Sequence, residues 1–314
     1  MDIELGGRTH IDLVRGYAPG SLNFRIMKFQ ENVLLSEYTT FKVGGPAKYF
    51  YVAKNKEDLI KAVQKAKQEN LKVFVLGGGS NVLASSSGYD GLVIKIENCE
   101  LKIENCKIYS GAGVNLLKLV TLAHKSSLSG MEWAIGIPGT VGGAVYGNAQ
   151  AFGSKMSDFI KELEVLEVRP PNSNIIRMSK NECDFSNKNS IFKKNKNLII
   201  LSAVLELKEG SQKEIEKTMK DFMEKRIGGQ PLDYPSAGSI FINKGEESSS
   251  SLIDKAGLKG RTVGGAQVSE KHAGFIINKN NATSDDILEL IKIIKEEVKT
   301  KFNVDLEAEI QMLE

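Results

Sequence analysis

The sequence has few of the residues that build metal centres and disulfide frameworks. Its 314 residues include only three cysteines and three histidines, and the cysteines lack the paired spacing of a zinc site. An odd, sparse set of cysteines indicates reduced thiols. We therefore expect no disulfide framework, no metal site and a cytoplasmic location.

The sequence also lacks a strong charge of one sign and any long apolar run. Its 42 basic and 39 acidic residues leave a formal charge of +3, spread along the chain, which argues against a dedicated nucleic-acid surface. No apolar run approaches the length of a membrane span. Residues 1–29 have mixed polarity without the apolar core of a signal peptide, so we expect a loosely packed N-terminal arm. We expect a monomer whose partner is a small molecule.

The chain shows a mixture of helical and strand-like periodicity with no internal repeat. Asn55 and Thr283 can each cap a helix. A length of 314 residues suggests two domains, and Gly210-Ser211 marks a boundary between them. The expected helices are 56–69, 115–126, 213–226 and 284–302. The principal expected strands are 49–52, 72–76, 162–168, 175–178 and 198–207, with a turn at 170–172.

The most unusual stretch is Gly136–Gly153, which is both glycine-dense and apolar. Six of its eighteen residues are glycine, while Ile137, Val145 and Phe152 need burial. This combination indicates backbone packed tightly against something large. Two interpretations stay open from these residues alone, namely a bulky planar cofactor along the segment or a glycine-rich turn within a sheet.

A second glycine run, Gly77-Gly78-Gly79-Ser80-Asn81, follows the apolar strand at 72–76. Consecutive glycines after a strand can leave amide hydrogens pointing into a concavity that binds phosphate, and Ser80 and Asn81 could add side-chain hydrogen bonds. The run matches neither the phosphate-loop pattern nor the spaced dinucleotide fingerprint. A plain tight turn therefore remains an equal alternative.

Near the C-terminus, Ser239 follows a glycine at the start of an apolar strand. The sequence offers no histidine and aspartate order of a catalytic triad, and the nucleophile-elbow pattern is absent. Ser239 is thus either a proton-donating hydroxyl or an ordinary serine. In residues 304–313, Leu306, Ala308, Ile310 and Met312 share one face, and Glu307, Glu309 and Gln311 share a face that is solvated by default.

Five motifs, taken in order from about Tyr38 to Glu314, resemble the UDP-N-acetylenolpyruvoylglucosamine reductase family. Their joint order and spacing are far more specific than any one of them. The motifs are Thr40–Gly45, Leu76–Asn81, Gly136–Gly143, Ala237–Phe241 and Val268–His272.

The resemblance implies an α+β fold in three parts. A two-lobed FAD-binding domain of the vanillyl-alcohol-oxidase type would span residues 30–209, with lobes at about 30–98 and 99–209. A C-terminal α+β substrate-binding domain would span residues 210–314, and residues 1–29 would form the arm. Two glycine runs would hold the cofactor. The implied FAD-binding residues are Gly77, Gly78, Gly79, Ser80, Asn81, Gly136, Pro138, Gly139, Thr140, Gly142 and Gly143.

The family's reaction, as the resemblance implies it, uses NADPH and FAD to reduce UDP-N-acetylglucosamine enolpyruvate to UDP-N-acetylmuramate for peptidoglycan synthesis. Ser239 occupies the position of the family's proton donor. Glu309 occupies the position of the carboxylate that stabilises the enolate-like intermediate, where a protonated glutamate could donate a hydrogen bond. Lys188 stands at the position of a family arginine and keeps its charge but not its bidentate fork.

The chain departs from the family pattern at Asn187, Lys188, Ile242 and Lys244, and at Gln150, where a glycine is common. Two alternatives stay open. One is a related FAD-dependent oxidase or dehydrogenase acting on an alcohol or hydroxy acid, which would not require the pair of Ser239 and Glu309. The other is a catalytically weakened flavin-binding homologue, which only the Asn187-Lys188 change favours. Candidates for the nucleotide-sugar side of the substrate are Arg226, Gln230 and Lys259.

Overall fold

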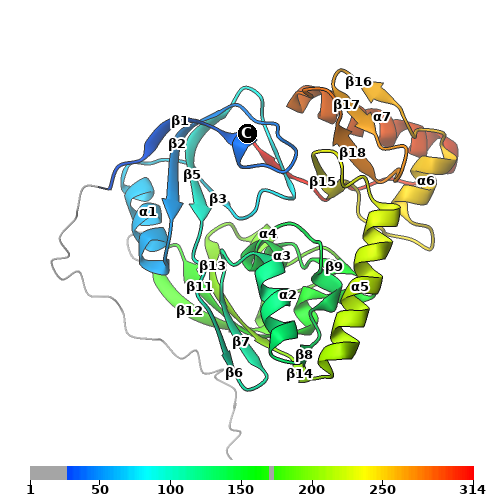
Figure 1. Ribbon diagram of the computed structural model, residues 1–314. Helices are drawn as coiled ribbons and strands as arrows, with labels where there is room; N and C mark the ends of the chain where they lie inside the picture. The colour runs from blue at the N-terminus through cyan, green and yellow to red at the C-terminus, as the bar shows by residue number, and fades with distance from the viewer. Residues whose placement is uncertain (1–26, 170–172) are drawn as a thin grey trace, which may run out of the picture.

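The computed structural model describes residues 27–169 and 173–314. The turn expected at 170–172, and residues 1–26 of the expected arm, lie outside the described residues. Figure 1 shows three parts, each with a sheet and helices. The first two parts come from the first two-thirds of the chain, and the third, which is smaller and coloured yellow to red, lies above the second.

The first part is a four-stranded sheet built on a strand–helix–strand unit. Asn55 accepts a hydrogen bond from the Asp58 amide and begins the helix α1, as predicted. The helix lets β2, β5 and β3 run parallel, while β1 pairs antiparallel with β2. The bounds, in sheet order, are β1 Gln30–Leu34, β2 Pro46–Ala53, β5 Tyr89–Ile96 and β3 Val73–Leu76, with α1 at Lys56–Gln68.

The second part is a five-stranded sheet in which every neighbouring pair is antiparallel. The helices α2 (Leu116–Lys125) and α3 (Val141–Tyr146) lie on it. Their buried side chains join those of α1 and β5 in one apolar cluster, so the first two parts share a core. The sheet order is β12 Asn174–Ser179, β11 Ile160–Glu167, β13 Leu198–Glu206, β7 Lys107–Gly111 and β6 Leu101–Glu104.

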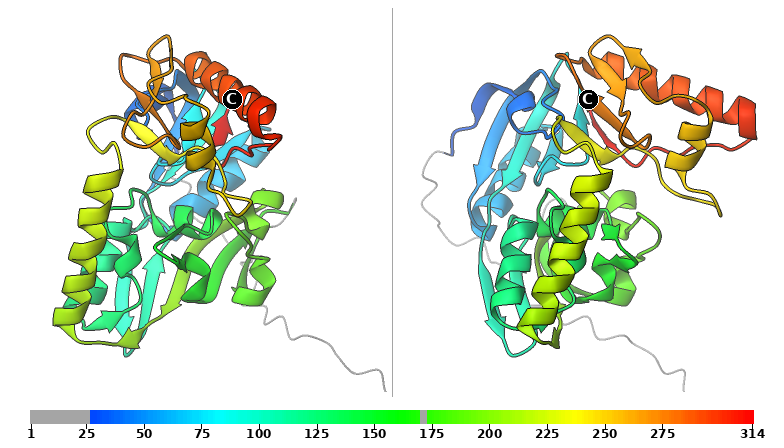
Figure 2. Two further views of the ribbon diagram at one scale, coloured as in Figure 1. Left: turned by 90° about the vertical axis from the view of Figure 1, so that its right-hand side faces the viewer. Right: turned by 45° about the vertical axis from the view of Figure 1, so that its right-hand side comes forward.

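The third part is a four-stranded sheet covered by the long helix α7, which is visible from two sides in Figure 2. Thr283 and Asp286 cap this helix reciprocally, as its sequence predicted. The helix α5 leads into this part and packs along α2 of the second part. The bounds are β15 Ser236–Ser239, β18 Phe275–Asn278, β17 Ala266–Val268 and β16 Thr262–Val263 in sheet order, with α5 Gln212–Gly229, α6 Ser249–Lys255 and α7 Ser284–Phe302.

The end of the chain returns to the first part. The last strand, β19 (Gln311–Leu313), pairs in parallel with β4 (Val82–Ala84), which directly follows the first glycine run. The Ser85 amide extends this pairing with a 2.9 Å hydrogen bond to the Leu313 carbonyl oxygen. The predicted division at residues 98 and 209 stays a prediction, but the last strand of the third part is bound to the first.

The expected solvated face of residues 304–313 is wrong at Glu309. The alternation is interrupted because Ala308 forms an isolated bridge with Phe241, and strand β19 begins only at Gln311. The side chain of Glu309 is only 12% exposed. This carboxylate therefore lies between the parts of the molecule, where its charge needs a partner.

Candidate active site

The two glycine runs pack directly against each other. A Cβ on Gly78 would lie 2.6 Å from the Gly139 Cα atom, and one on Gly77 would lie 2.6 Å from Thr140 Oγ1. Gly139, with φ +126°, leaves room for Ser80 Oγ, which would lie 2.7 Å from an added Cβ. These distances are too short for any side chain, so the close approach of the two backbones requires glycine at both runs.

The centre of Gly136–Gly153 is a helix and not a turn within a sheet. Thr140 begins α3, and its Oγ1 accepts a 3.3 Å hydrogen bond from the Gly143 amide. Gly142 lies against the Cβ atom of Ala112, 2.8 Å from where its own Cβ would be. Much of the glycine requirement therefore comes from the protein's own packing, and the roles predicted for these residues in cofactor binding stay predictions.

The run Gly77–Asn81 offers five consecutive amide donors. Within residues 27–169 and 173–314, none of these five amides donates a hydrogen bond to another residue. Four of the five residues are half-buried and Gly79 is buried with φ +66°. A half-buried set of open amides fits the diphosphate of FAD, which needs such donors.

The side chain of Asn81, whose predicted role in cofactor binding stays a prediction, makes a hydrogen bond within the protein. Asn81 Nδ2 donates to the Glu309 carbonyl oxygen at 3.2 Å, and the main-chain carbonyl oxygen of Asn81 accepts from the Gln311 amide at 3.0 Å. Asn81 thus joins the first glycine run to the segment that carries Glu309.

The structure brings the segments of Ser239 and Glu309 together. The Glu309 amide donates to the Ile240 carbonyl oxygen at 2.7 Å, and the Ile242 amide donates to the Glu307 carbonyl oxygen at 2.9 Å. Ser239 ends β15, opposite Phe275 of β18, and it is exposed. The hydroxyl and the carboxylate therefore come from adjacent extended segments, separated by 70 residues of sequence but joined by backbone hydrogen bonds.

Lys188 lies against Glu309. Its Nζ atom is 3.2 Å from Glu309 Oε1, and the two side chains are 22% and 12% exposed. Lys188 has φ +55°, a conformation that costs about 1–2 kcal/mol for a residue with a Cβ. Lys193 Nζ donates to the Lys188 carbonyl oxygen at 2.7 Å and so holds this strained backbone. The ion pair connects the second part of the molecule to the third.

The other departures from the family pattern are also neighbours. Asn187 Nδ2 donates to the Asn243 carbonyl oxygen at 2.9 Å, and Asn187 Oδ1 accepts from Gln150 Nε2 at 2.5 Å. Lys244 forms an ion pair with Glu307, two residues before Glu309. These positions lie far apart in the sequence, and their pairing depends on tertiary structure.

Arg226, Gln230 and Lys259 lie in different surroundings. Arg226 is 6% exposed, and its Nη2 donates to the Trp133 carbonyl oxygen at 3.0 Å. Burial lowers the pKa of its guanidinium group. Gln230 ends α5 one turn later, whereas Lys259 is exposed and pairs with Asp254 at 2.6 Å. The structure does not gather these three side chains into one cluster.

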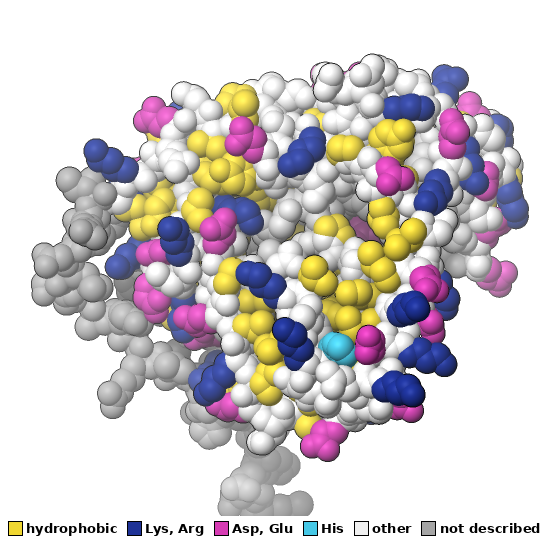
Figure 3. Space-filling view, viewed as in Figure 1, with side chains coloured by type: hydrophobic (Ala, Val, Ile, Leu, Met, Phe, Trp, Pro, Cys, Tyr) yellow, Lys and Arg dark blue, Asp and Glu magenta, His cyan; other side chains and the backbone are white. Residues whose placement is uncertain are grey.

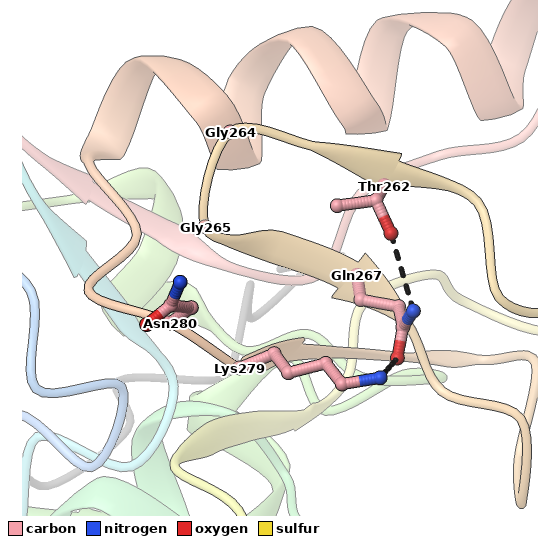
Figure 4. A pocket seen from close by; sticks show the side chains of 6 residues that line it. All are labelled: Thr262, Gly264, Gly265, Gln267, Lys279 and Asn280. Atoms are coloured by element: carbon pink, nitrogen blue, oxygen red, sulfur yellow. Dashed lines mark hydrogen bonds between the residues drawn. The ribbon is translucent and has the colours of Figure 1, made fainter.

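The face shown in Figure 3 is hollowed near its centre, between the part that carries α3 and the part that carries β15, with hydrophobic side chains along the rim. A separate pocket of about 430 Å³ lies on the C-terminal sheet. Its polar groups satisfy one another, because Lys279 donates to Gln267, which donates to Thr262 (Figure 4). This pocket shares no residue with the site of Ser239 and Glu309.

Comparison with known proteins identifies first the class of protein and then the family. The FAD binding domain family matches residues 47–177, which hold both glycine runs. The C-terminal domain family of UDP-N-acetylenolpyruvoylglucosamine reductase matches residues 230–313, which hold Ser239 and Glu309. The first match gives the class, a protein with an FAD-binding domain.

Whole-chain relatives make the assignment specific. UDP-N-acetylenolpyruvoylglucosamine reductase of Caldanaerobacter subterraneus subsp. tengcongensis is 42% identical over 287 residues, covering 91% of this chain and 94% of the relative. The Clostridium novyi enzyme of the same name is 41% identical, covering 91% and 92%. The crystal structure of UDP-N-acetylenolpyruvylglucosamine reductase from Thermus caldophilus superposes with a TM-score of 0.77 at 34% identity, covering 91% of this chain and all of that one.

The chain therefore belongs to the UDP-N-acetylenolpyruvoylglucosamine reductase family. The family, the α+β fold class and FAD as cofactor, all predicted from the motifs, are confirmed. The roles of individual residues stay predictions.

We predict that Gly78→Ala lowers the amount of FAD that copurifies with the protein. The new methyl carbon would lie 2.6 Å from the Gly139 Cα atom. One of the two glycine runs would have to move to relieve this clash. Overpacking of this kind costs about 1–3 kcal/mol. Flavin absorbance per protein and thermal unfolding measure both effects.

Gly228→Ala is the matched control, since nothing lies within 4 Å of an added Cβ there and the residue is helical. It should keep full flavin content. A Gly78→Ala protein with normal flavin content and normal stability would contradict the contact between the runs.

Proposed function

We propose that this chain reduces UDP-N-acetylglucosamine enolpyruvate to UDP-N-acetylmuramate with NADPH as co-substrate, in the synthesis of peptidoglycan precursors. The relatives across both matched regions support this activity. The observation that carries the residue assignment is the 2.7 Å hydrogen bond from the Glu309 amide to the Ile240 carbonyl oxygen, beside Ser239. The two glycine runs would hold FAD, which would supply the hydride-transfer chemistry between NADPH and the methylene carbon of the enolpyruvyl group.

Ser239 donates the proton that completes the reduction. Hydride addition to the methylene carbon leaves negative charge on the carbon next to the substrate carboxylate. A serine hydroxyl is a weak acid and gives up its proton only to a strong base, which this carbon is. Ser239 is exposed at the end of β15, so its hydroxyl is accessible to a substrate.

Glu309 and Lys188 act as a pair. In the 3.2 Å ion pair the Glu309 carboxylate accepts a hydrogen bond from Lys188, and it does not donate one. We therefore assign the stabilisation of the negative charge on the substrate to the Lys188 ammonium, and the orientation of that ammonium to Glu309. This assignment differs from the protonated glutamate that the resemblance suggested.

The contacts of the Asn187–Lys188 turn favour an active enzyme over a weakened homologue. Asn187 bonds to Gln150 and to Asn243, and Lys188 keeps a cation against Glu309. The turn thus holds Lys188 in a strained conformation that keeps its cation against Glu309.

The remaining assignments rest on resemblance. Arg226, Gln230 and Lys259 are proposed for the nucleotide-sugar side of the substrate, with Arg226 supported by its buried guanidinium, whose Nε has no hydrogen-bond partner among the described residues. In the described part of the chain, no helix has the length and apolar character needed to cross a membrane. The monomeric state and the cytoplasmic location stay predictions.

Two half-reactions test the proposed function. Purified protein should be yellow with bound FAD. Under anaerobic conditions NADPH should bleach the flavin, and UDP-N-acetylglucosamine enolpyruvate should restore its colour. Bleaching without recovery on adding this substrate would contradict the proposed activity and would favour a different FAD-dependent reductase or oxidase.

We predict that Ser239→Ala separates the two half-reactions. Hydride transfer from NADPH to the flavin does not use the Ser239 hydroxyl, so the rate of bleaching should stay unchanged. Recovery of the flavin by the enolpyruvyl substrate should slow by about 10²- to 10⁴-fold, the usual contribution of a positioned acid. Rapid mixing with absorbance detection measures each step. Equal losses in both steps would show that Ser239 is not the proton donor.

A further inference from the structure

Lys95 lies at the base of the first glycine run. It occupies the carboxyl end of β5, in register with Leu76 at the carboxyl end of β3, and Gly77 follows directly. Its Nζ atom donates to the Gly77 carbonyl oxygen at 2.7 Å. In open sheets with parallel strands, ligands commonly bind beyond the carboxyl ends of the strands.

Lys95 carries its charge at a half-buried position. Among residues 27–169 and 173–314, no carboxylate lies at ion-pair distance from this ammonium, whose hydrogen bond goes to a carbonyl oxygen. Burial is the main cause that lowers the pKa of Lys95, while the charges of Glu97 and Cys99 act in the opposite direction. A half-buried cation without a counter-ion is costly unless an anion lies close by.

Two independent observations thus meet at one place. The five amides of Gly77–Asn81 donate to no other described residue, and none of the described carboxylates forms an ion pair with the cation next to them. Both features suit a ligand with negative charge on oxygen atoms. If these donors served only the fold, at least some of them would be expected to have acceptors within the protein.

We propose that Lys95 is the cation of the diphosphate subsite for FAD. The amides of Gly77–Asn81 supply hydrogen bonds, and Lys95 supplies the positive charge that the uncharged amides lack. This inference rests on FAD binding and not on the roles assigned to Ser239 and Glu309, so the two can fail separately.

A competing explanation is that Lys95 only supports the loop through its bond to the Gly77 carbonyl oxygen. Substitution by glutamine separates the two explanations. Glutamine is neutral but keeps an N–H donor for that oxygen. Lys95→Arg keeps both the charge and a donor, and Lys95→Met removes both.

The experiment measures binding and stability in place of turnover. Flavin is removed from the purified full-length protein, and the dissociation constants of FAD and riboflavin are measured by fluorescence titration. Riboflavin carries the same tricyclic ring but no diphosphate. Lys72→Gln is the matched control. Lys72 is an exposed lysine just before β3, at the amino end of the strand, whereas Lys95 lies at the carboxyl end of the neighbouring strand.

We expect Lys95→Gln and Lys95→Met each to weaken FAD binding by about 10-fold, the loss of one charge-assisted hydrogen bond. Riboflavin binding should change less than 2-fold, and Lys95→Arg and Lys72→Gln should bind FAD as the unaltered protein does. The FAD affinity of the unaltered protein should also fall more steeply with salt than that of Lys95→Gln.

Three results would overturn the proposal. Lys95→Gln with unaltered FAD affinity would assign Lys95 to loop support. Equal losses of affinity for FAD and riboflavin would show that Lys95 does not act on the diphosphate. Should Lys95→Met fail to fold by thermal unfolding, the comparison of Lys95→Gln with Lys95→Arg decides alone, and equal FAD affinities of those two variants would refute the role of the charge.

Discussion

The site depends on the ion pair between Lys188 and Glu309, because it is made by two parts of the molecule that have separate sheets. Lys188 is held in a left-handed conformation within a short turn of the second part, and Glu309 lies just before the last strand. An isolated carboxylate that is only 12% exposed would be costly, so the third part gains from closing onto Lys188. Backbone hydrogen bonds within the third part set Glu309 beside the segment of Ser239, and the ion pair brings Lys188 to the same place. The contact between the two parts therefore lies at the proposed catalytic site.

The first glycine run also takes part in this closure. Its Asn81 side chain donates to the Glu309 carbonyl oxygen, and β4, which follows it, pairs with the last strand of the chain. The second run packs on the first with no space for side chains. The loop proposed to bind the diphosphate is therefore fixed by the same elements that carry Ser239 and Glu309. On this proposal, cofactor binding and assembly of the site are linked through shared contacts.

Local signals were sufficient for much of the fold. Asn55 and Thr283 cap the helices they were expected to cap, and Gly77–Asn81 follows its strand. Helix α3 was missed because Gly142 and Gly143 disfavour a helix, and tertiary packing against Ala112 overrides that preference. The pairing of Gln150 with Asn187, 37 residues away, and the place of Lys95 below Gly77 have no local signal. The burial of Glu309 was missed because the alternation of residues 304–313 shows only which side chains share a face. It does not show that another part of the molecule covers that face, as the second part does at Glu309.

A double-mutant cycle tests the central contact most directly. Lys188→Met, Glu309→Gln and the double variant are compared by the rate at which the enolpyruvyl substrate reoxidises the flavin, with Lys194→Met, a neighbouring exposed lysine that pairs with Asp184, as control. The account predicts that the double variant is no slower than the slower single variant, a coupling of about 1–3 kcal/mol, with bleaching by NADPH unchanged. Independent effects whose free energies simply add, or equal losses in bleaching, would contradict it.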